Sequence, residues 1–388
     1  MFARISRKII KMQISIWEKE SFYAPKDVII VGSGLVGLWC AWHLKKNDPT
    51  LSVAIVDRGI IPTGASTRNA GFACFGSVTE LVEDAARFGE ENMLQLVEMR
   101  YKGLQYIRKV FKPVTIDFEL CGGYELFTGN EKAQITSLDH DIEHLNTLLK
   151  DITGRNQTFK RADKKIAAQG LHHVTHLIEN KLEGYLHSGK LCQALLQTVQ
   201  SMGVTVLNAI EISGFEKQND HIELYTNQFV PLRTSKLLIC TNAFARQLLP
   251  ALDIVPARGQ VLVTSPIENL PLKGTFHFDA GYYYFRNLGN RVLLGGARNK
   301  AFEEETTTEL TTTNTIQQEL EHFLCTYILP GYSYQITDRW SGIMGMGNEK
   351  LPIVKEVSPQ VFCAVRMSGM GVALAPVIGQ RIAKLLSS

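Results

Sequence analysis

Three glycines and one aspartate within the first 60 residues have the spacing that binds the diphosphate of a dinucleotide. Gly32, Gly34 and Gly37 give the pattern G-x-G-x-x-G, and Asp57 follows 20 residues after the last glycine. Such glycines allow a tight turn and a close approach of the pyrophosphate, and the first N–H groups of the next helix carry partial positive charge. The acid accepts hydrogen bonds from a ribose. The spacing therefore predicts dinucleotide binding.

The same glycine pattern also occurs in turns that bind nothing, so the elements around it decide its meaning. DVIIVG (27–32) is an apolar, β-branched run that predicts a buried strand. LVGLWCAWHLKK predicts a helix that ends at Asn47, and SVAIVD predicts a second strand that ends at Asp57. Strand, helix, strand and acid form the βαβ unit that the pattern requires.

The loop after Asp57 favours a flavin over a nicotinamide. GIIPTGASTRNAGFACFGS is rich in small residues, and Ala70 and Gly71 leave room for a flat aromatic ring system. Its polar residues can hydrogen-bond a diphosphate and a ring edge; they are Ser66, Thr67, Arg68 and Asn69. A nicotinamide enzyme has no need of this loop.

The ordered motifs from Asp27 to Leu386 resemble those of the D-amino-acid-oxidase-like flavoproteins, which include glycine, sarcosine and γ-glutamylputrescine oxidases. In chain order they are GSGLVG, ASTRNAGF, CTNA, PARGQ, YYYFR with RVLLGGAR, RWSGIMG and MSGMGVALAP. The resemblance implies an α/β fold: a discontinuous Rossmann-like FAD-binding domain and an α+β substrate domain built on an antiparallel sheet. The expected boundaries are 1–90, 155–250 and 336–388 for the first domain, and 91–154 and 251–335 for the second.

Hydrophobic periodicity gives the same outline without the resemblance. Helices are expected over residues 80–110, 131–150, 189–203 and 307–328, and strands over 204–210, 221–226, 235–241, 255–265, 280–287 and 291–297. The C-terminal segment 361–386 predicts a strand, a glycine turn and a helix that starts near Val372. The positive end of that helix would face the flavin pyrimidine.

The resemblance also implies the cofactor, its ligands and its noncovalent attachment. Phe72 and Met344 occupy the positions of covalent flavin links in relatives, and neither forms such a link. The residues expected to hold FAD are Gly32, Gly34, Val36, Gly37, Asp57, Arg58, Ser66, Thr67, Arg68, Asn69, Ala70, Gly71, Phe72, Ile212, Thr241, Asn242, Gly342, Gly369, Met370, Gly371 and Val372.

The expected substrate residues depart from the family pattern. Relatives that act on amino acids carry a carboxylate-binding arginine where this chain has Met344. Arg286 is the candidate replacement, although it is also consistent with an ion pair between domains. Tyr282 is the strongest candidate of the YYYFR segment for the pocket, and packing within the sheet is the equal alternative. A pair of carboxylates in the pocket would indicate a polyamine, and a second arginine an amino acid.

The resemblance predicts oxidation of a C–N bond in a small amine or amino acid, with hydride transfer to flavin N5 and electrons passed to O2 or to a carrier. Three alternatives stay open. They are an amine dehydrogenase with a non-oxygen acceptor, an oxidase acting on a tRNA wobble-uridine side chain, and a flavoprotein without catalysis.

Composition narrows the class of protein. The chain has 388 residues, 45% of them hydrophobic, and a net charge of +3, so no polybasic field for nucleic acid is expected. No apolar run reaches about 20 residues, and seven scattered cysteines favour neither disulfides nor a metal site. We therefore expect a cytoplasmic protein without a membrane span. The first dozen residues are basic and are predicted to form a disordered tail. Both Met1 and Met12 are consistent with a translation start.

Overall fold

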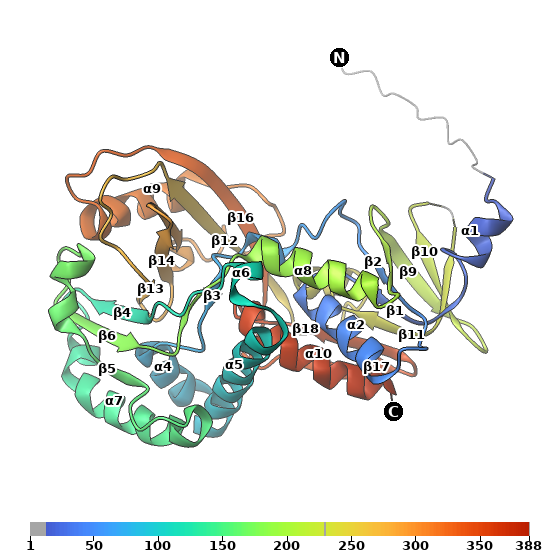
Figure 1. Ribbon diagram of the computed structural model, residues 1–388, viewed down its shortest axis with the longest axis horizontal. Coiled ribbons are helices and arrows are strands. Elements are labelled where there is room, and N and C mark those ends of the chain that lie inside the picture. Colours follow the sequence, from blue (N-terminus) through green and yellow to red (C-terminus); the bar gives the residue numbers. More distant parts are fainter. Residues whose placement is uncertain (1–12, 229, 388) are drawn as a thin grey trace, which may run out of the picture.

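The computed structural model of the protein describes residues 13–228 and 230–387. The basic tail and both candidate starts lie outside the described residues. Two large sheets, each with its own helices, make up the molecule (Figure 1). Residues of both parts line one cavity. Within the described ranges, no helix is both long enough and apolar enough to cross a membrane.

The first sheet has the parallel core that the βαβ pattern predicts. Its order is β17-β18-β11-β1-β2-β8; β10 also pairs with β11, and β9 pairs with β10, both in the antiparallel sense. From β8 to β18 the strands run parallel, and β17 closes the edge in the antiparallel sense. The strands are β1 (Lys26–Val31), β2 (Val53–Val56), β8 (Thr205–Leu207), β9 (Ile212–Lys217), β10 (Ile222–Thr226), β11 (Leu232–Ile239), β17 (Ile353–Ser358) and β18 (Val361–Val365).

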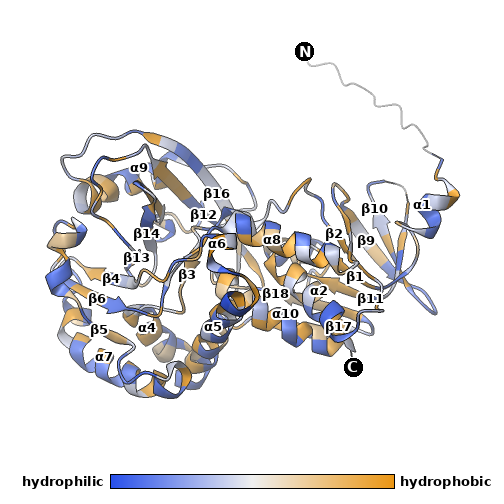
Figure 2. Cartoon of the chain, in the orientation of Figure 1, coloured by the Kyte–Doolittle hydropathy of each residue, from blue (hydrophilic) through white to orange (hydrophobic). Residues whose placement is uncertain are grey.

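Helices cover this sheet tightly. From Leu35 to Lys45, helix α2 is buried on every side, since it contacts the sheet, α8 and α10. Gly103 lets α5 touch α10, because a Cβ there would lie 1.8 Å from the carbonyl oxygen of Ala373. Figure 2 shows hydrophobic and hydrophilic residues alternating along α5 and α7, as one buried face requires. The helices are α1 (Ile16–Glu20), α2 (Leu35–Asn47), α3 (Ala65–Arg68), α4 (Val78–Phe88), α5 (Glu90–Val110), α6 (Pro113–Ile116), α7 (Lys132–Thr153), α8 (Ser188–Ser201), α9 (Asn314–Phe323) and α10 (Gly371–Ser387).

The second sheet is antiparallel except where β13 pairs with β4. Its order is β16-β12-β15-β14-β13-β4-β6-β5, and α9 packs on one face, where the rings of Phe276, Phe285 and Phe323 meet. The strands are β4 (Gly123–Phe127), β5 (Phe159–Arg161), β6 (His176–Asn180), β12 (Val255–Thr264), β13 (Thr275–Phe278), β14 (Tyr283–Leu288), β15 (Arg291–Gly296) and β16 (Ile336–Met346). A small sheet pairs β3 (Phe72–Ala73) with β7 (Gly184–Tyr185).

Several elements differ from the expected outline. Strands β5, β6 and β16 pair in the second sheet, although the predicted boundaries place 155–180 and 336–346 with the first. Helix α5 was expected in the substrate domain, and it packs on α10 of the first. The helix expected from 307 begins at Asn314, with Thr313 as its N-cap. Pairing between distant segments decides sheet membership, so periodicity within one segment does not reveal it.

Candidate functional site

A cavity of about 680 Å³ runs between the two sheets, within the size range of small-molecule sites. Its lining comes from many segments that are far apart in the sequence. They include the turn between β1 and α2, the end of β2, the loop 62–74, α4, residues 240–248, strands β12 and β16, residues 277–284 and residues 364–373.

The opening glycine turn has the geometry that a diphosphate needs. Gly32 has φ +110°, a conformation that favours glycine, and Gly34 caps α2 without a side chain. A Cβ on Gly37 would lie 2.2 Å from the carbonyl oxygen of Gly32, so glycine is required for α2 to approach β1. The N-terminal end of α2, with its partial positive charge, therefore lies at the cavity.

Asp57 is held at the end of β2 with its carboxylate at the cavity wall. The backbone N–H and the hydroxyl of Ser33 donate to its Oδ2 at 2.8 and 2.7 Å, and Gly59 N–H donates to Oδ1 at 2.8 Å. Oδ2 thus accepts two hydrogen bonds and Oδ1 only one, so Oδ1 can accept a further hydrogen bond from a ribose hydroxyl.

Residues around Asp57 form an end suited to adenosine. The guanidinium of Arg58 lies 4.1 Å from the ring centre of Phe244, and Ile212 closes the wall from β9. The hydroxyl of Thr241 is buried and has no hydrogen-bond partner among the described residues. A buried polar atom without a partner is costly, so a ligand atom is expected beside it.

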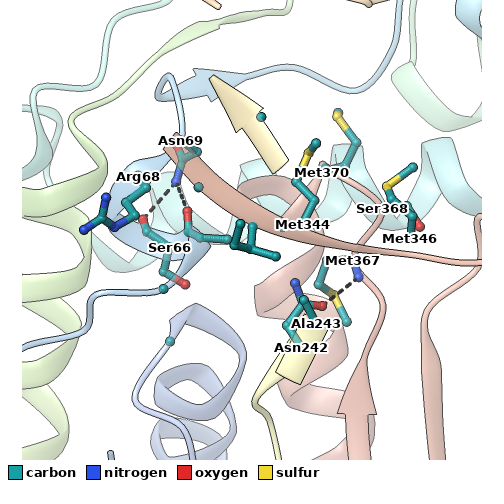
Figure 3. A pocket seen from close by; sticks show the side chains of 18 of the residues that line it. Ser66, Arg68, Asn69, Asn242, Ala243, Met344, Met346, Met367, Ser368 and Met370 are labelled. Atoms are coloured by element: carbon teal, nitrogen blue, oxygen red, sulfur yellow. Dashed lines mark hydrogen bonds between the residues drawn. The ribbon is translucent and has the colours of Figure 1, made fainter. Parts of the chain in front are cut away.

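The loop 65–72 joins the two halves of the site (Figure 3). Ser66 Oγ accepts from Leu35 N–H at 2.9 Å, and Arg68 Nη1 donates to the carbonyl of Ser341 at 3.0 Å. The indole N–H of Trp340 donates to the carbonyl of Arg68 at 2.8 Å. Asn69 stabilises the turn by donating to the carbonyl of Ser66. The loop is thus bonded both to the start of α2 and to β16.

The second sheet presents a recess to the cavity. Gly259 of β12 and Gly342 of β16 are direct partners in the register, so neither fills this face. A Cβ on Gly259 would lie 3.4 Å from Met344 Cε and 3.6 Å from the Tyr284 hydroxyl. The recess therefore has a glycine floor and walls of methionine and tyrosine, a shape that accepts a planar ring.

The closing turn meets this recess. Ser368 and Gly369 have φ values of +46° and +82°, and α10 then begins at Gly371. Asn242 Oδ1 accepts from the backbone N–H groups of Arg366 and Met367, at 3.0 and 3.4 Å (Figure 3). The positive end of α10 therefore lies at the cavity, where Gly371 and Val372 form part of the wall.

Residues 27–385 match the family model described as FAD dependent oxidoreductase, DAO. The chain belongs to this family. A probable oxidoreductase, OrdL, of Rhizobium meliloti (strain 1021) is 25% identical over 371 residues, which cover 92% of this chain and 82% of the relative.

Solved structures share the fold. Glycine oxidase from Geobacillus kaustophilus has a TM-score of 0.76 at 20% identity, covering 94% of this chain and 95% of the other. L-Proline dehydrogenase from P. horikoshii has a TM-score of 0.74 at 18% identity, covering 94% of this chain and 93% of the other. The DAO family match and this fold confirm an FAD-dependent oxidoreductase.

The described residues of this DAO family member fit FAD. Of the residues expected to hold it, those that line the cavity are Gly32, Gly34, Val36, Asp57, Arg58, Ser66, Arg68, Asn69, Ala70, Phe72, Ile212, Thr241, Asn242, Gly342, Gly369, Met370, Gly371 and Val372. Gly37, Thr67 and Gly71 lie behind this wall. A Cβ on Gly71 would lie 2.2 Å from the carbonyl oxygen of Leu186, and Thr67 bonds to Pro62.

The expected substrate residues divide into two groups. Tyr282 and Met344 line the cavity, as does Tyr284, whereas Tyr283 turns to the opposite face and donates to Glu319. Arg286, the candidate for the carboxylate clamp, is not among the residues that line the cavity, which favours a different role. Its guanidinium is buried, donates to the carbonyl of Ala70 at 2.7 Å and lies over the ring of Tyr185. Arg286 thus positions the flavin loop.

A charged cluster on α4 was not expected from the sequence. Lys350 Nζ lies 2.9 Å from Glu80 Oε1 and 2.6 Å from Asp84 Oδ1, and Arg100 also reaches Glu80. Burial raises the pKa of Glu80, but the charges of Lys350 and Arg100 outweigh it and hold this pKa well below its usual range. Glu80 and Asp84, which both line the cavity, are therefore paired with cations.

His277 was also missed, because a single histidine in an alternating strand gives no signal. It lines the cavity from β13, directly opposite Tyr284 in the register and 5.1 Å from the ring of Phe72. Its Nε2 is buried and has no partner in the part of the chain that the structure describes. Burial lowers its pKa from 6.5 to about 4, so the ring is neutral at pH 7.

This burial predicts a pH-dependent stability. The unfolded chain binds a proton at His277 near pH 6.5 and the folded chain only near pH 4, so stability is lost as the pH falls through that window. Between pH 7 and pH 4.5 this loss amounts to about 2 kcal/mol, and we expect His277→Gln to remove it. Urea unfolding at pH 7 and pH 4.5 checks it, with the exposed His140→Gln as control. An unchanged pH slope in His277→Gln would contradict the expectation.

Proposed function

We propose that the protein uses FAD to oxidise a C–N single bond in a small amine or amino acid, by hydride transfer to flavin N5. The observation that carries the proposal is the single cavity that joins the dinucleotide turn to the glycine-floored recess. Two similar structures are named for the amino acids glycine and proline, each with nitrogen on the α-carbon. This likeness supports a C–N substrate.

FAD, when bound, supplies the two-electron acceptor. The chain's own residues must orient the substrate and exclude water. Tyr282, Tyr284 and Met344 form a mostly apolar wall, and a low-dielectric pocket lowers the pKa of a bound amine, which keeps its nitrogen unprotonated. The N-terminal end of α10 adds positive potential at the closing turn, which stabilises negative charge that develops there.

The test begins with the purified protein. We expect a yellow protein that releases all of its flavin on acid precipitation, because the attachment is noncovalent. Anaerobic addition of glycine, sarcosine, proline, putrescine and γ-glutamylputrescine should then bleach the colour with at least one of them. Oxygen consumption measured against dye reduction identifies the acceptor.

Two results would contradict the proposal at different levels. A protein that binds no flavin under any refolding condition would remove the cofactor as well as the chemistry. Bound flavin that dithionite bleaches, but that no amine or amino acid bleaches, would remove the C–N substrate alone.

A further inference from the structure

We propose that Arg298 binds a carboxylate of the substrate, so that the substrate is an amino acid and not a simple amine or polyamine. This proposal rests on the proposed function. It assigns the anion-binding role to a residue outside RWSGIMG, the segment in which Met344 stands, and replaces the role expected of Arg286.

Arg298 is placed by the end of β15. It follows Ala297, which has φ +60° and donates its N–H to the carbonyl of Tyr282 at 2.8 Å. The guanidinium lies 4.8 Å from the ring centre of Phe302, and that ring meets the ring of Tyr282 at 5.8 Å. All three side chains line the cavity. Stacking on Phe302 constrains the guanidinium and leaves its N–H edge free to meet a planar anion.

The cation has no protein partner. Among residues 13–228 and 230–387, nothing forms a hydrogen bond or an ion pair with the Arg298 guanidinium. Glu305 is the acid whose charge acts on it, but Arg258 binds both oxygens of Glu305, at 2.9 and 2.7 Å. Burial lowers the pKa of Arg298, as expected for a cation taken from water without a counter-ion. An anionic ligand would supply the missing charge.

Neutral groups beside Arg298 fit an amino acid. In the described part of the chain, the Tyr284 hydroxyl has no hydrogen-bond partner, and His277 directly opposite it has a free Nε2. Of the three acids that α4 presents to the cavity, Glu80 and Asp84 are paired with Lys350, and Glu83 is exposed to solvent. The wall near the tyrosines therefore offers an unpaired positive charge and neutral polar atoms.

The test uses the flavin-loaded protein and redox-inert ligand pairs: acetate and acetamide, and pyrrole-2-carboxylate and its carboxamide. Dissociation constants are measured from the flavin spectrum and from the thermal shift. We expect at least one carboxylate to bind the wild type about tenfold more tightly than its amide. Arg298→Met should remove that difference without weakening amide binding, and Arg298→Lys should restore part of it.

Lys300→Met is the matched control. Lys300 lies two residues away on the same short 3-10 helix, is exposed and does not line the cavity. The substitution therefore removes one positive charge without changing a residue of the site. Its carboxylate preference should equal that of the wild type. In turnover, Arg298→Met should raise KM for an amino acid about tenfold and leave KM for the matching decarboxylated amine unchanged.

Three outcomes overturn the inference: no carboxylate is preferred over its amide, Arg298→Met retains the preference, or Lys300→Met loses it equally. These are distinguishable from failure of the proposed function. Carboxylate binding that depends on Arg298, in a protein whose flavin no amine or amino acid reduces, would leave the anion site and remove the C–N chemistry. Reduction of the flavin by amines, at a rate that does not depend on Arg298, would keep the C–N chemistry and remove the anion site.

Discussion

Gly37→Val is expected to yield a protein that purifies without flavin. A Cβ at this position would lie 2.2 Å from the carbonyl oxygen of Gly32 and 3.2 Å from the side chain of Ile30, and valine adds two further methyl groups. Strand β1 cannot move away, because it is paired on both sides, with β2 and β11. Helix α2 must shift instead, and its first N–H groups then leave the diphosphate position.

Overpacking of this kind costs about 3 kcal/mol, so we expect FAD affinity to fall about 100-fold or more. The ratio of absorbance at the flavin band to that of the protein, with FAD titration of the apoprotein, measures it. Gly214→Val on β9 is the control, since a Cβ there meets only Tyr225 at 3.7 Å. Full flavin content in Gly37→Val would refute the role of this close approach.

Arg258→Met is expected to destabilise the domain of the second sheet by about 3 to 5 kcal/mol. Arg258 and Glu305 are both buried, with side chains 3% and 1% exposed, and Gln260 also donates to Glu305. Removing the arginine leaves a carboxylate without its cation in a site that water does not reach. The ion pair joins β12 to the segment before α9. Its loss should therefore destabilise the packing of that segment on β12.

Denaturant unfolding followed by fluorescence measures this effect, and a double variant sharpens it. Arg258→Met combined with Glu305→Gln removes the orphaned charge and should recover part of the stability. Arg233→Met is the control, because its pair with Glu223 is half exposed and contributes about 1 kcal/mol or less. Equal stability of Arg258→Met and Arg233→Met would contradict the argument.

Most residues predicted to hold the cofactor line the cavity, because the motifs that contain them are local. Gly32, Gly34 and Gly37 meet steric demands within one strand–turn–helix, and a run of seven residues carries most of the flavin loop. The start of α10 near Val372 followed from the glycine turn before it. In each case the residues that impose the constraint are neighbours in the chain, so their types reveal the conformation.

The substrate side was less predictable because its contacts join distant segments. Along β14 and the residue before it, alternation places Tyr282, Tyr284 and Arg286 on one face. It does not reveal that the Arg286 guanidinium donates to the carbonyl of Ala70, 216 residues away. Alternation also does not reveal that the carboxylate of Glu305 pairs with Arg258 and not with Arg298.

Sequence patterns alone predicted the family, the cofactor and the glycine turns at the cavity, since those depend on backbone space within short segments. Folding decided which cations are paired, which tyrosines face the cavity and that His277 is buried there. Charge pairing and burial depend on which strands become neighbours. The residue pattern along one strand does not indicate which strand pairs with it.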